Sequence, residues 1–379
     1  MKVNQLKLDT LNNNNDEAKY FAAFSYLNVR PIFKTRLLEY FDFDIKRAWE
    51  CDKQDLINFS ELNEEISIPR DFLSKKAKLN IEECYQKAFE DNEVKLLTIK
   101  DEKYPPLLKE IPDYPISLFY KGNLDNVSYD CNLAIVGSRN ASMEAKLALN
   151  KIISEFNNTN ITIVSGLAYG IDAQAHKSAI ENNLKTIGVI GCGLDIVYPA
   201  QNKYLYEKII NGAGAIFSEY PLKTPPMAQN FPQRNRIVVG ASKGTLVAEA
   251  KIKSGAMISA NLTLDYNREL MCMPGNLMNP NTEGIYHLIK QGAGITICAQ
   301  DILNQLNWDI MTQEKDEYMY ELNEAQKSIL DIISLEAKSF DEIIKNTSLD
   351  VAQLMITLTE LEIKGLIIQE NNKYHKYIG

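Results

Sequence analysis

The sequence predicts an α/β protein in which a central Rossmann-like, doubly wound and mostly parallel sheet lies between an N-terminal all-α domain and a C-terminal winged-helix domain. Three observations support this prediction. Short apolar segments alternate with helical patterns between residues 131 and 300, helical clusters precede them, and a pattern of three helices and two strands follows them. Alternating strands and helices are typical of sheets that bind ligands at the carboxyl ends of their strands.

The N-terminal third is predicted to be helical. Residues 1–16 are polar and rich in asparagine, without the apolar core of a signal peptide, so we expect a disordered lead-in. Residues 17–92 hold short apolar clusters at i, i+3 and i+4 spacing, which predicts several short helices. From residue 93 a proline-rich arm with one or two strands leads into the core.

The core is expected to extend to residue 300. Its predicted strands are residues 133–136, 161–164, 186–190, 215–217, 245–247, 269–273 and 295–297. We then expect a linker at residues 301–319 and the winged-helix domain at residues 320–379. The last 60 residues hold 6 Lys and Arg against 10 Asp and Glu, so we expect this domain to contact protein or to regulate rather than to read a major groove.

Charge is divided unevenly along the chain, whose formal net charge is −9. Residues 131–300 hold 15 Lys and Arg against 11 Asp and Glu, so this segment carries +4 and the remainder −13. A surface that binds phosphates is therefore expected in the core.

The six cysteines form no CxxC pair and the three histidines are scattered, so we expect no metal site, and no apolar run is long enough to span a membrane. The composition predicts a cytoplasmic protein.

The turn after the first core strand, LAIVGSRNA, is the first candidate binding site. Gly137 allows a ligand to approach, Ser138 follows it, and Arg139 offers a planar group that matches a phosphate. We expect a helix to begin at residues 138–140, so that its N-terminus attracts an anion. A glycine turn with a surface arginine and no ligand is the alternative.

Three further loops carry polar chemistry. The second strand is followed by SGLAYGIDAQAH, and the third strand is followed by GCGLDIVYPAQN. The second of these loops does not match the dinucleotide-binding fingerprint, because Ile196 stands where its last glycine should be. Binding of NAD or FAD is therefore disfavoured. After the fourth strand, Phe231 offers a stacking surface and Arg234, Asn235 and Arg236 offer charge. Alternatively, one of these arginines pairs with Glu219 and Phe231 belongs to the core.

The loop after the fifth strand completes the predicted pocket. EAKIKSGAMISA places Lys251, Ser254 and Gly255 at a turn from strand to helix, where the lysines either belong to one basic pocket with Arg139 and Arg234 or form a solvated face. His176 stands four residues after Asp172, which suggests acid–base chemistry, although a capping pair is the more common reason for this spacing.

These blocks, in this order, resemble the DprA/Smf family of bacterial DNA-processing proteins. Further matching segments are SEYP, FPQRNRIVVGAS, PGN at residues 274–276 and GIYHLIKQGA at residues 284–293. The resemblance implies a sterile-alpha-motif-like helical domain, a Rossmann-like core that forms a homodimer, and a winged helix. It also implies that the protein binds and protects single-stranded DNA and loads the RecA recombinase during natural transformation, without a catalytic residue or a cofactor.

The resemblance also implies which residues contact DNA. These are Gly137, Ser138, Arg139, Ser165, Gly166, Phe231, Arg234, Asn235, Arg236, Lys251, Ser254 and Gly255, with Lys223 as a weaker candidate. Two positions depart from the family pattern. Tyr169 stands where arginine is usual, which removes a charge but leaves a possible stacking ring, and Met143 and Glu144 replace an aromatic residue and a glycine.

Two other functions remain open at this point. One is a Rossmann-like nucleotide or phosphoribosyl hydrolase of the lysine-decarboxylase-like type, with Glu249 or Asp172 as its carboxylate, although the PGGxGTxxE signature of that group is absent. The other is a module that senses a small anionic nucleotide. A groove that extends beyond one phosphate site favours DNA, whereas a closed pocket favours a nucleotide.

Overall fold

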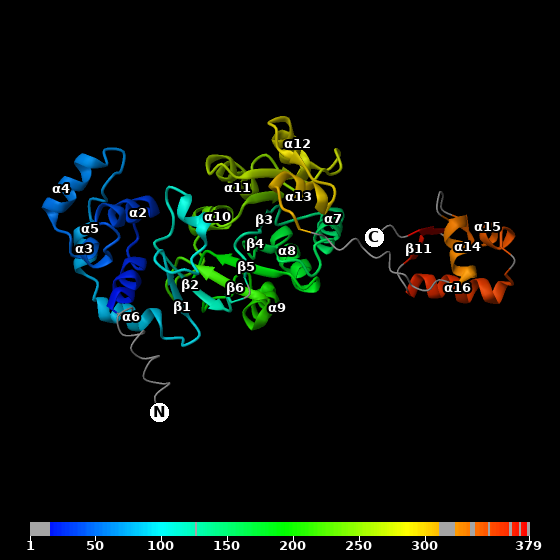
Figure 1. The fold of residues 1–379 in the computed structure, drawn as a ribbon, viewed down its shortest axis with the longest axis horizontal. Helices are drawn as coiled ribbons and strands as arrows, with labels where there is room; N and C mark the ends of the chain where they lie inside the picture. Colours follow the sequence, from blue (N-terminus) through cyan, green and yellow to red (C-terminus); the bar gives the residue numbers. More distant parts are fainter. Residues whose placement is uncertain are drawn as a thin grey trace, which may run out of the picture. The chain divides into compact units, whose positions relative to one another are not determined.

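The computed structural model describes residues 16–125, 127–310, 323–333, 338–347, 349–363, 366–370 and 373–376 (Figure 1). The chain divides into two compact units, Met1–Gln313 and Glu314–Gly379. The expected lead-in lies almost entirely outside the described residues, as do residues 311–319 of the expected linker. Each unit is described by itself below.

The N-terminal part of the first unit is a small helical domain. Residues 16–25 are helical, and they precede α2 (Pro31–Tyr40), α3 (Ile45–Glu50), α4 (Lys53–Leu62), α5 (Phe72–Ala77) and α6 (Ile81–Ala88). Asp52 caps α4 by accepting hydrogen bonds from the N–H groups of Gln54 and Asp55. Phe33 packs edge-on against Phe59 and Phe72 in the domain core.

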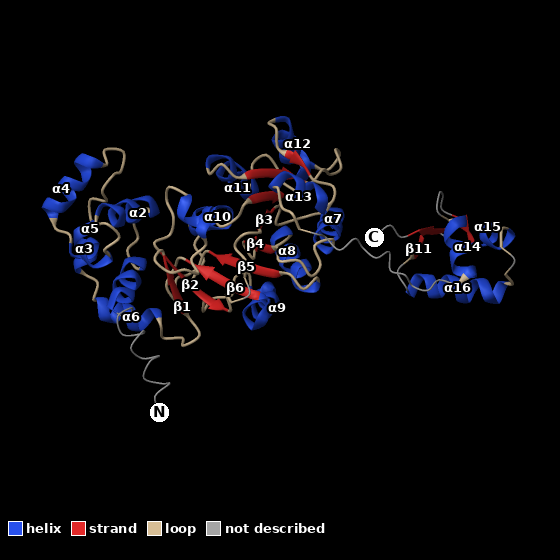
Figure 2. Ribbon diagram, viewed as in Figure 1, coloured by secondary structure: helices blue, strands red, loops and turns tan. Residues whose placement is uncertain are grey.

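Nine strands form the central sheet, in the order β1-β2-β6-β5-β4-β3-β7-β8-β9. Figure 2 labels the first six of these strands, from β1 to β3. The strands are β1 (Lys95–Thr98), β2 (Ser117–Gly122), β3 (Asn132–Val136), β4 (Thr162–Ser165), β5 (Lys185–Ile190), β6 (Gly214–Ser218), β7 (Gly244–Val247), β8 (Glu269–Cys272) and β9 (Gly294–Ile295). Strands β3 to β9 pair in parallel, and β1 and β2 add an antiparallel edge at β6. The predicted mostly parallel sheet is therefore confirmed.

Helices cover both faces of this sheet because the apolar side chains of a strand point alternately to its two sides. Leu133 and Ile135 of β3 pack with α7, α8 and α13, whereas Ala134 and Val136 pack in the cluster that includes α10, α11 and α12. The helices are α7 (Met143–Ser154), α8 (Ile171–Glu181), α9 (Lys203–Lys208), α10 (Asn230–Gly240), α11 (Gly255–Asp265), α12 (Glu283–Lys290) and α13 (Ala299–Leu306). Shorter helical turns are η1 (Pro106–Glu110), η2 (Ala200–Asn202), η3 (Ile209–Ala213) and η4 (Pro280–Thr282).

The expected boundary at residue 300 differs from the structure. Residues 301–306 belong to α13, whose Ile302, Leu303 and Leu306 are buried in the core cluster beside β3. The polar residues between these positions face solvent, so the segment reads as a linker by composition although one helical face is apolar.

The second unit has the predicted winged-helix layout. It contains α14 (Glu324–Ile332), β10 (Lys338–Ser339), α15 (Phe340–Lys345), α16 (Val351–Ile363), β11 (Ile367–Glu370) and β12 (Lys373–Lys376), with the strands in the order β10-β12-β11. Ile329, Ile343, Leu354 and Leu361 form its buried centre. Within the described residues of both units, no helix combines the length and apolarity that a membrane crossing requires.

Candidate nucleic-acid interface

The first cavity lies where the order of the sheet reverses. After β3 the chain adds β4, β5 and β6 on one side, and it then returns to place β7 on the other side of β3. Ligands of doubly wound sheets bind outside the carboxyl ends of the strands at such a point. A cavity of about 400 Å³ occupies this place. Its lining includes Val136, Gly137, Ser138, Arg139, Asn140, Ala168, Asp172, Arg234, Asn235, Lys251, Ser254, Gly255, Ala256, Ser259 and Asn281.

The turn after β3 is held by the loops beside it. The N–H group of Ser138 donates to the Glu249 carbonyl at 2.7 Å, and the N–H group of Ile171 donates to the Ser138 carbonyl at 3.1 Å. Gly170 has a φ of +76°, and a Cβ there would lie 2.1 Å from the Ser138 oxygen. The Ser138 N–H group is thus used within the protein, and Gly170 allows the second loop to approach the first.

The expected helix start after Gly137 is wrong. Helix α7 begins at Met143, with Ser142 as its N-cap. The carboxylate of Glu249, which is 1% exposed, accepts hydrogen bonds from the Ser142 N–H group at 3.2 Å and from its hydroxyl at 2.6 Å. An internal carboxylate therefore occupies the anion site at the start of α7. The helix whose first residues line the cavity is α11, with Gly255 and Ala256.

A second cavity adjoins the first and is largely aromatic. Arg139 is exposed, and its guanidinium carbon lies 5.7 Å from the ring centre of the half-buried Phe231. The Tyr198 ring lies 5.5 Å from the Phe231 ring, and the hydroxyl of Tyr169 donates to Gln201. Tyr169, Tyr198 and Phe231 all line this cavity, which shares Arg139, Ala168 and Arg234 with the first. The second cavity is small, about 50 Å³, and the two adjoining cavities on either side of Arg139 are together called the groove below.

Arg234 lies at the base of this groove. It is 4% exposed, and its Nη1 donates to the Gly166 carbonyl at 2.6 Å and to the Val189 carbonyl. Desolvation lowers its pKa, and it also raises the pKa of Asp172, which is 8% exposed and lines the first cavity. A Cβ at Gly166 would lie 2.6 Å from both the Arg234 Nη2 and the Asp172 Oδ2, so only glycine fits between these groups.

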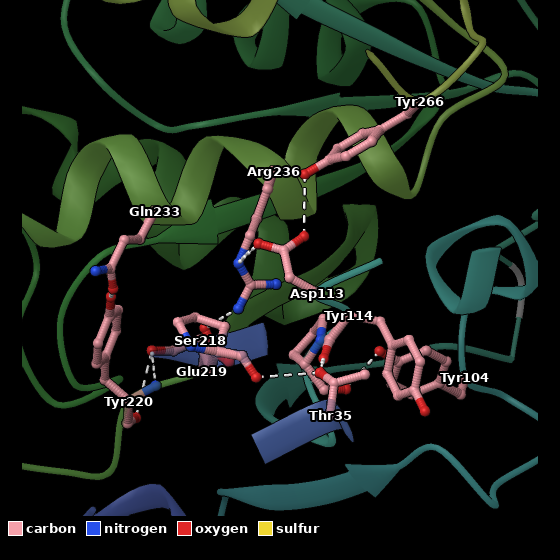
Figure 3. Close-up of polar contacts among 12 residues, drawn as sticks. Thr35, Tyr104, Asp113, Tyr114, Ser218, Glu219, Tyr220, Gln233, Arg236 and Tyr266 are labelled. Atoms are coloured by element: carbon pink, nitrogen blue, oxygen red, sulfur yellow. Dashed lines mark hydrogen bonds and ion pairs between the residues drawn. The ribbon is translucent and has the colours of Figure 1, made fainter. Parts of the chain in front are cut away.

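Arg236 lies away from the groove, contrary to its predicted place in the pocket. It is 3% exposed, its Nη2 lies 2.6 Å from the Glu219 carboxylate, and its Nε lies 3.5 Å from that of Asp113 (Figure 3). On an α-helix, residues two apart point to different sides, so Arg234 and Arg236 cannot serve the same site. The pairing with Glu219, which the sequence left open for one arginine, occurs at Arg236.

Two other predicted residues also lie outside the groove. Ser165 is 0% exposed and donates from its hydroxyl to the Ile135 carbonyl at 2.7 Å. Lys223 forms an ion pair with Glu90 of the helical domain and lines neither of the two cavities. The remaining predicted residues line one or both cavities: Gly137, Ser138, Arg139, Gly166, Tyr169, Phe231, Arg234, Asn235, Lys251, Ser254 and Gly255.

Several lining residues were not predicted. Tyr198 comes from the irregular loop after β5, and only its aromatic ring near a strand end could have suggested it. Asn281 comes from η4, after β8, and donates to the Asn140 carbonyl at 3.2 Å. No sequence motif marks Asn281, because the pairing of its loop with the turn after β3 depends on the tertiary fold.

The residues considered for acid–base chemistry, His176 and Glu249, are held inside the protein by hydrogen bonds. His176 is 0% exposed, and its Nδ1 lies 2.7 Å from the Thr186 hydroxyl rather than beside Asp172. Burial lowers the pKa of His176 to about 3. Glu249 caps α7, as described above. Among the described residues, no three His, Cys, Asp or Glu side chains gather as a metal site would require.

Comparisons with known proteins match the core and the winged-helix unit to one family. A family model described as DNA recombination-mediator protein A matches residues 95–307, more than half of the chain, and one described as the DprA winged helix domain matches residues 316–372. The chain is 32% identical to protein Smf of Synechocystis over 94% of this chain and 98% of that protein. It is 41% identical to DNA processing protein DprA of Streptococcus pneumoniae over 56% of this chain and 74% of that protein.

Two solved structures are similar to the structure of this chain. The X-ray structure of DNA processing protein A from S. pneumoniae matches with a TM-score of 0.63 and 32% identity, over 74% of this chain and 99% of that one. DNA processing protein A from Helicobacter pylori, described for its single-stranded DNA binding mode, matches with a TM-score of 0.51 and 28% identity, over 57% and 98%. The chain therefore belongs to the DprA/Smf family of DNA-processing recombination mediators.

Proposed function

We propose that the groove binds single-stranded DNA without reading its sequence. The observation that carries the proposal is that two cavities share Arg139, Ala168 and Arg234, so the groove extends beyond one phosphate site. A nucleotide needs one enclosed pocket, whereas a strand needs an open path. The single-stranded DNA binding mode described for the H. pylori relative supports the same function.

The chemistry of the groove suits an unpaired strand. Arg139 is exposed and, among the described residues, forms no ion pair, and Lys251 lines the same cavity, so both are available to phosphates. Phe231, Tyr169 and Tyr198 offer rings on which bases can stack, at about 1–3 kcal/mol per base. Phosphate contacts and stacking do not distinguish the four bases, and binding should weaken steeply with salt.

Family membership supports the wider role. We propose that the protein protects incoming single strands and loads RecA in the cytoplasm during natural transformation, as a homodimer through its Rossmann-like core. Two linked grooves would raise the effective concentration of one strand at the second groove. No reaction is assigned to the groove. Glu249 and His176 are buried and already hydrogen-bonded within the protein, and Asp172, which lines the first cavity, accepts a hydrogen bond from the Ala168 N–H group at 3.4 Å.

Fluorescence anisotropy of a labelled oligo-dT of about 30 nucleotides, titrated across a salt series, tests the proposal. Arg139→Ala should weaken binding about tenfold or more, because a hydrogen bond to a charged group contributes about 1.5–3 kcal/mol. It should also lower the slope of log K against log salt by about 0.7 per lost phosphate contact.

Arg47→Ala is the matched control, because Arg47 is exposed and lies 5.6 Å from the Phe41 ring, much as Arg139 lies above Phe231. It should bind like the wild type. Equal affinities for the wild type and Arg139→Ala would refute the groove assignment, and hydrolysis of nucleotides would then be tested.

A further inference from the structure

A third cavity, also of about 400 Å³, lies between the helical domain and the core. Its walls come from residues 25–34 and from the segment 219–233 after β6. The first cavity lies at the ends of β7 and β3, the second at the ends of β4 and β5, and the third at the end of β6. Neighbouring strands lie about 4.8 Å apart, so the three cavities follow one another along the carboxyl edge of the sheet.

Adjacent residues at the start of α10 line the second and third cavities. Phe231 lines the second cavity, and its neighbour Asn230 lines the third. The Nδ2 of Asn230 donates at 3.0 Å to the carbonyl of Gly191, which lines the second cavity. Two adjacent residues of α10 thus line the aromatic part of the groove and the third cavity.

Three charged side chains line the third cavity, and two of them have partners. Glu219 pairs with Arg236, and Lys223 pairs with Glu90. Lys34, on α2, is half-buried, and none of the hydrogen bonds or ion pairs between described residues involves its amino group. Desolvation lowers the pKa of Lys34 to about 8, with Glu219 opposing and Arg236 adding to this effect.

A half-buried ammonium group without a carboxylate is costly, because it loses water without gaining a partner. A phosphate would supply that partner. The same cavity offers further polar groups in Asn28, Gln229 and Gln233, and an aromatic ring in Tyr220. Amide groups and aromatic rings also line the groove already described, for example Asn235, Tyr169 and Phe231.

We propose that the single strand continues past Phe231 across the end of β6 and that Lys34 binds one of its backbone phosphates, so that the helical domain is part of the DNA footprint. This inference rests on the proposed function. It assigns to the helical domain a direct contact with the nucleic acid, in addition to its packing on the core.

The test uses the full chain and two oligo-dT lengths, about 6 nucleotides, enough for the first two cavities, and about 20 nucleotides. Lys34→Met keeps the length of the side chain without its charge. It should weaken binding of the long oligonucleotide about tenfold and lower its salt slope by about 0.7, and it should leave the short one unchanged. Lys34→Arg should restore binding, and Lys46→Met, which removes an exposed charge elsewhere in the helical domain, should have no effect.

Three results would overturn the inference. If Lys34→Met binds both lengths like the wild type while Arg139→Ala binds neither, the groove stands and its extension is wrong. If Lys34→Met weakens both lengths equally, Lys34 acts within the first site or on the fold. If inorganic phosphate binds at Lys34 but does not compete with the long oligonucleotide, the cavity is a separate anion site. A loss of the Arg139 effect would instead be a failure of the proposed function.

Discussion

Arg139 and Arg236 were both predicted to line the pocket, but their surroundings are opposite. Arg139 is exposed and lies over the Phe231 ring, with no carboxylate partner among the described residues. Arg236 is 3% exposed and lies between Glu219 and Asp113 (Figure 3). We therefore expect a basic residue near the groove to contribute to a ligand site only where the protein leaves its charge unpaired. Four predictions test this difference between the two arginines, beginning with the largest expected effect.

Arg236→Met should mainly lower stability. Removing one partner of a buried ion pair leaves the other uncompensated, which costs about 3 kcal/mol or more. Urea unfolding should show this loss, whereas oligo-dT affinity, measured where the variant is folded, should stay close to that of the wild type. Combining it with Glu219→Gln should recover part of the stability. A variant that stays stable but loses affinity would place Arg236 in the interface.

Phe231→Leu should mainly lower affinity. It keeps an apolar side chain in the half-buried position but removes the ring between Arg139, Arg234 and Tyr198. We expect a loss of about 1–3 kcal/mol in binding, the contribution of one stacked base. Phe231→Tyr is the control that retains the ring. Unchanged binding by Phe231→Leu would mean that the strand does not stack at this position.

Lys34 should make binding of long oligonucleotides dependent on pH. Its pKa is about 8 in the free protein, and a bound phosphate would raise it, so binding requires proton uptake once the pH exceeds 8. The contribution of Lys34 is therefore complete below pH 8 and declines above it, by up to about tenfold in affinity. Tyr26 and Tyr220 line the same cavity, and burial raises the pKa of each, so neither should titrate in this range. Lys223, Glu219 and Arg236 are held in ion pairs.

Anisotropy titrations from pH 7.5 to about pH 9.5 check this dependence. Lys34→Arg should lack it, because the guanidinium stays charged throughout this range. A decline of equal size in Lys34→Arg would assign the pH dependence to another group.

Lys223→Ala should have the smallest effect. Its ion pair with Glu90 is exposed, and such pairs contribute about 0–1 kcal/mol to stability. Its affinity for oligo-dT should equal that of the wild type, in contrast to Arg139→Ala. A clear loss of affinity would mean that DNA displaces Glu90 and that Lys223 joins Lys34 in the extended path.

Much of the fold could be predicted from the sequence because local patterns determine it. The seven predicted core strands correspond to β3–β9 with small shifts at their ends, since buried parallel strands are short apolar runs between turns. The winged-helix pattern was likewise visible. The start of α7 was predicted too early, at residues 138–140. The helix begins after its N-cap Ser142, and the carboxylate at that cap, Glu249, comes from the loop after β7.

The site was predicted in part for the same reason. Residues in strand-end turns, such as Gly137, Arg139 and Gly255, could be assigned to one edge of the sheet from the strand order alone. Which arginine of α10 faces the groove depends on the rotation of that helix, which Glu219 and Asp113 fix from distant segments. The third cavity depends on how the helical domain packs against the segment after β6, for which the sequence offers no local signal.

Glu249 has a consequence for the energetics of binding. Its carbonyl accepts from Ser138, and its carboxylate accepts from Ser142 and, at 3.4 Å, from Asn279. One residue thus joins the loops after β3, β7 and β8 before any ligand arrives. The conformational entropy of these loops is lost during folding rather than during association, so an incoming strand meets a surface that needs little reorganisation.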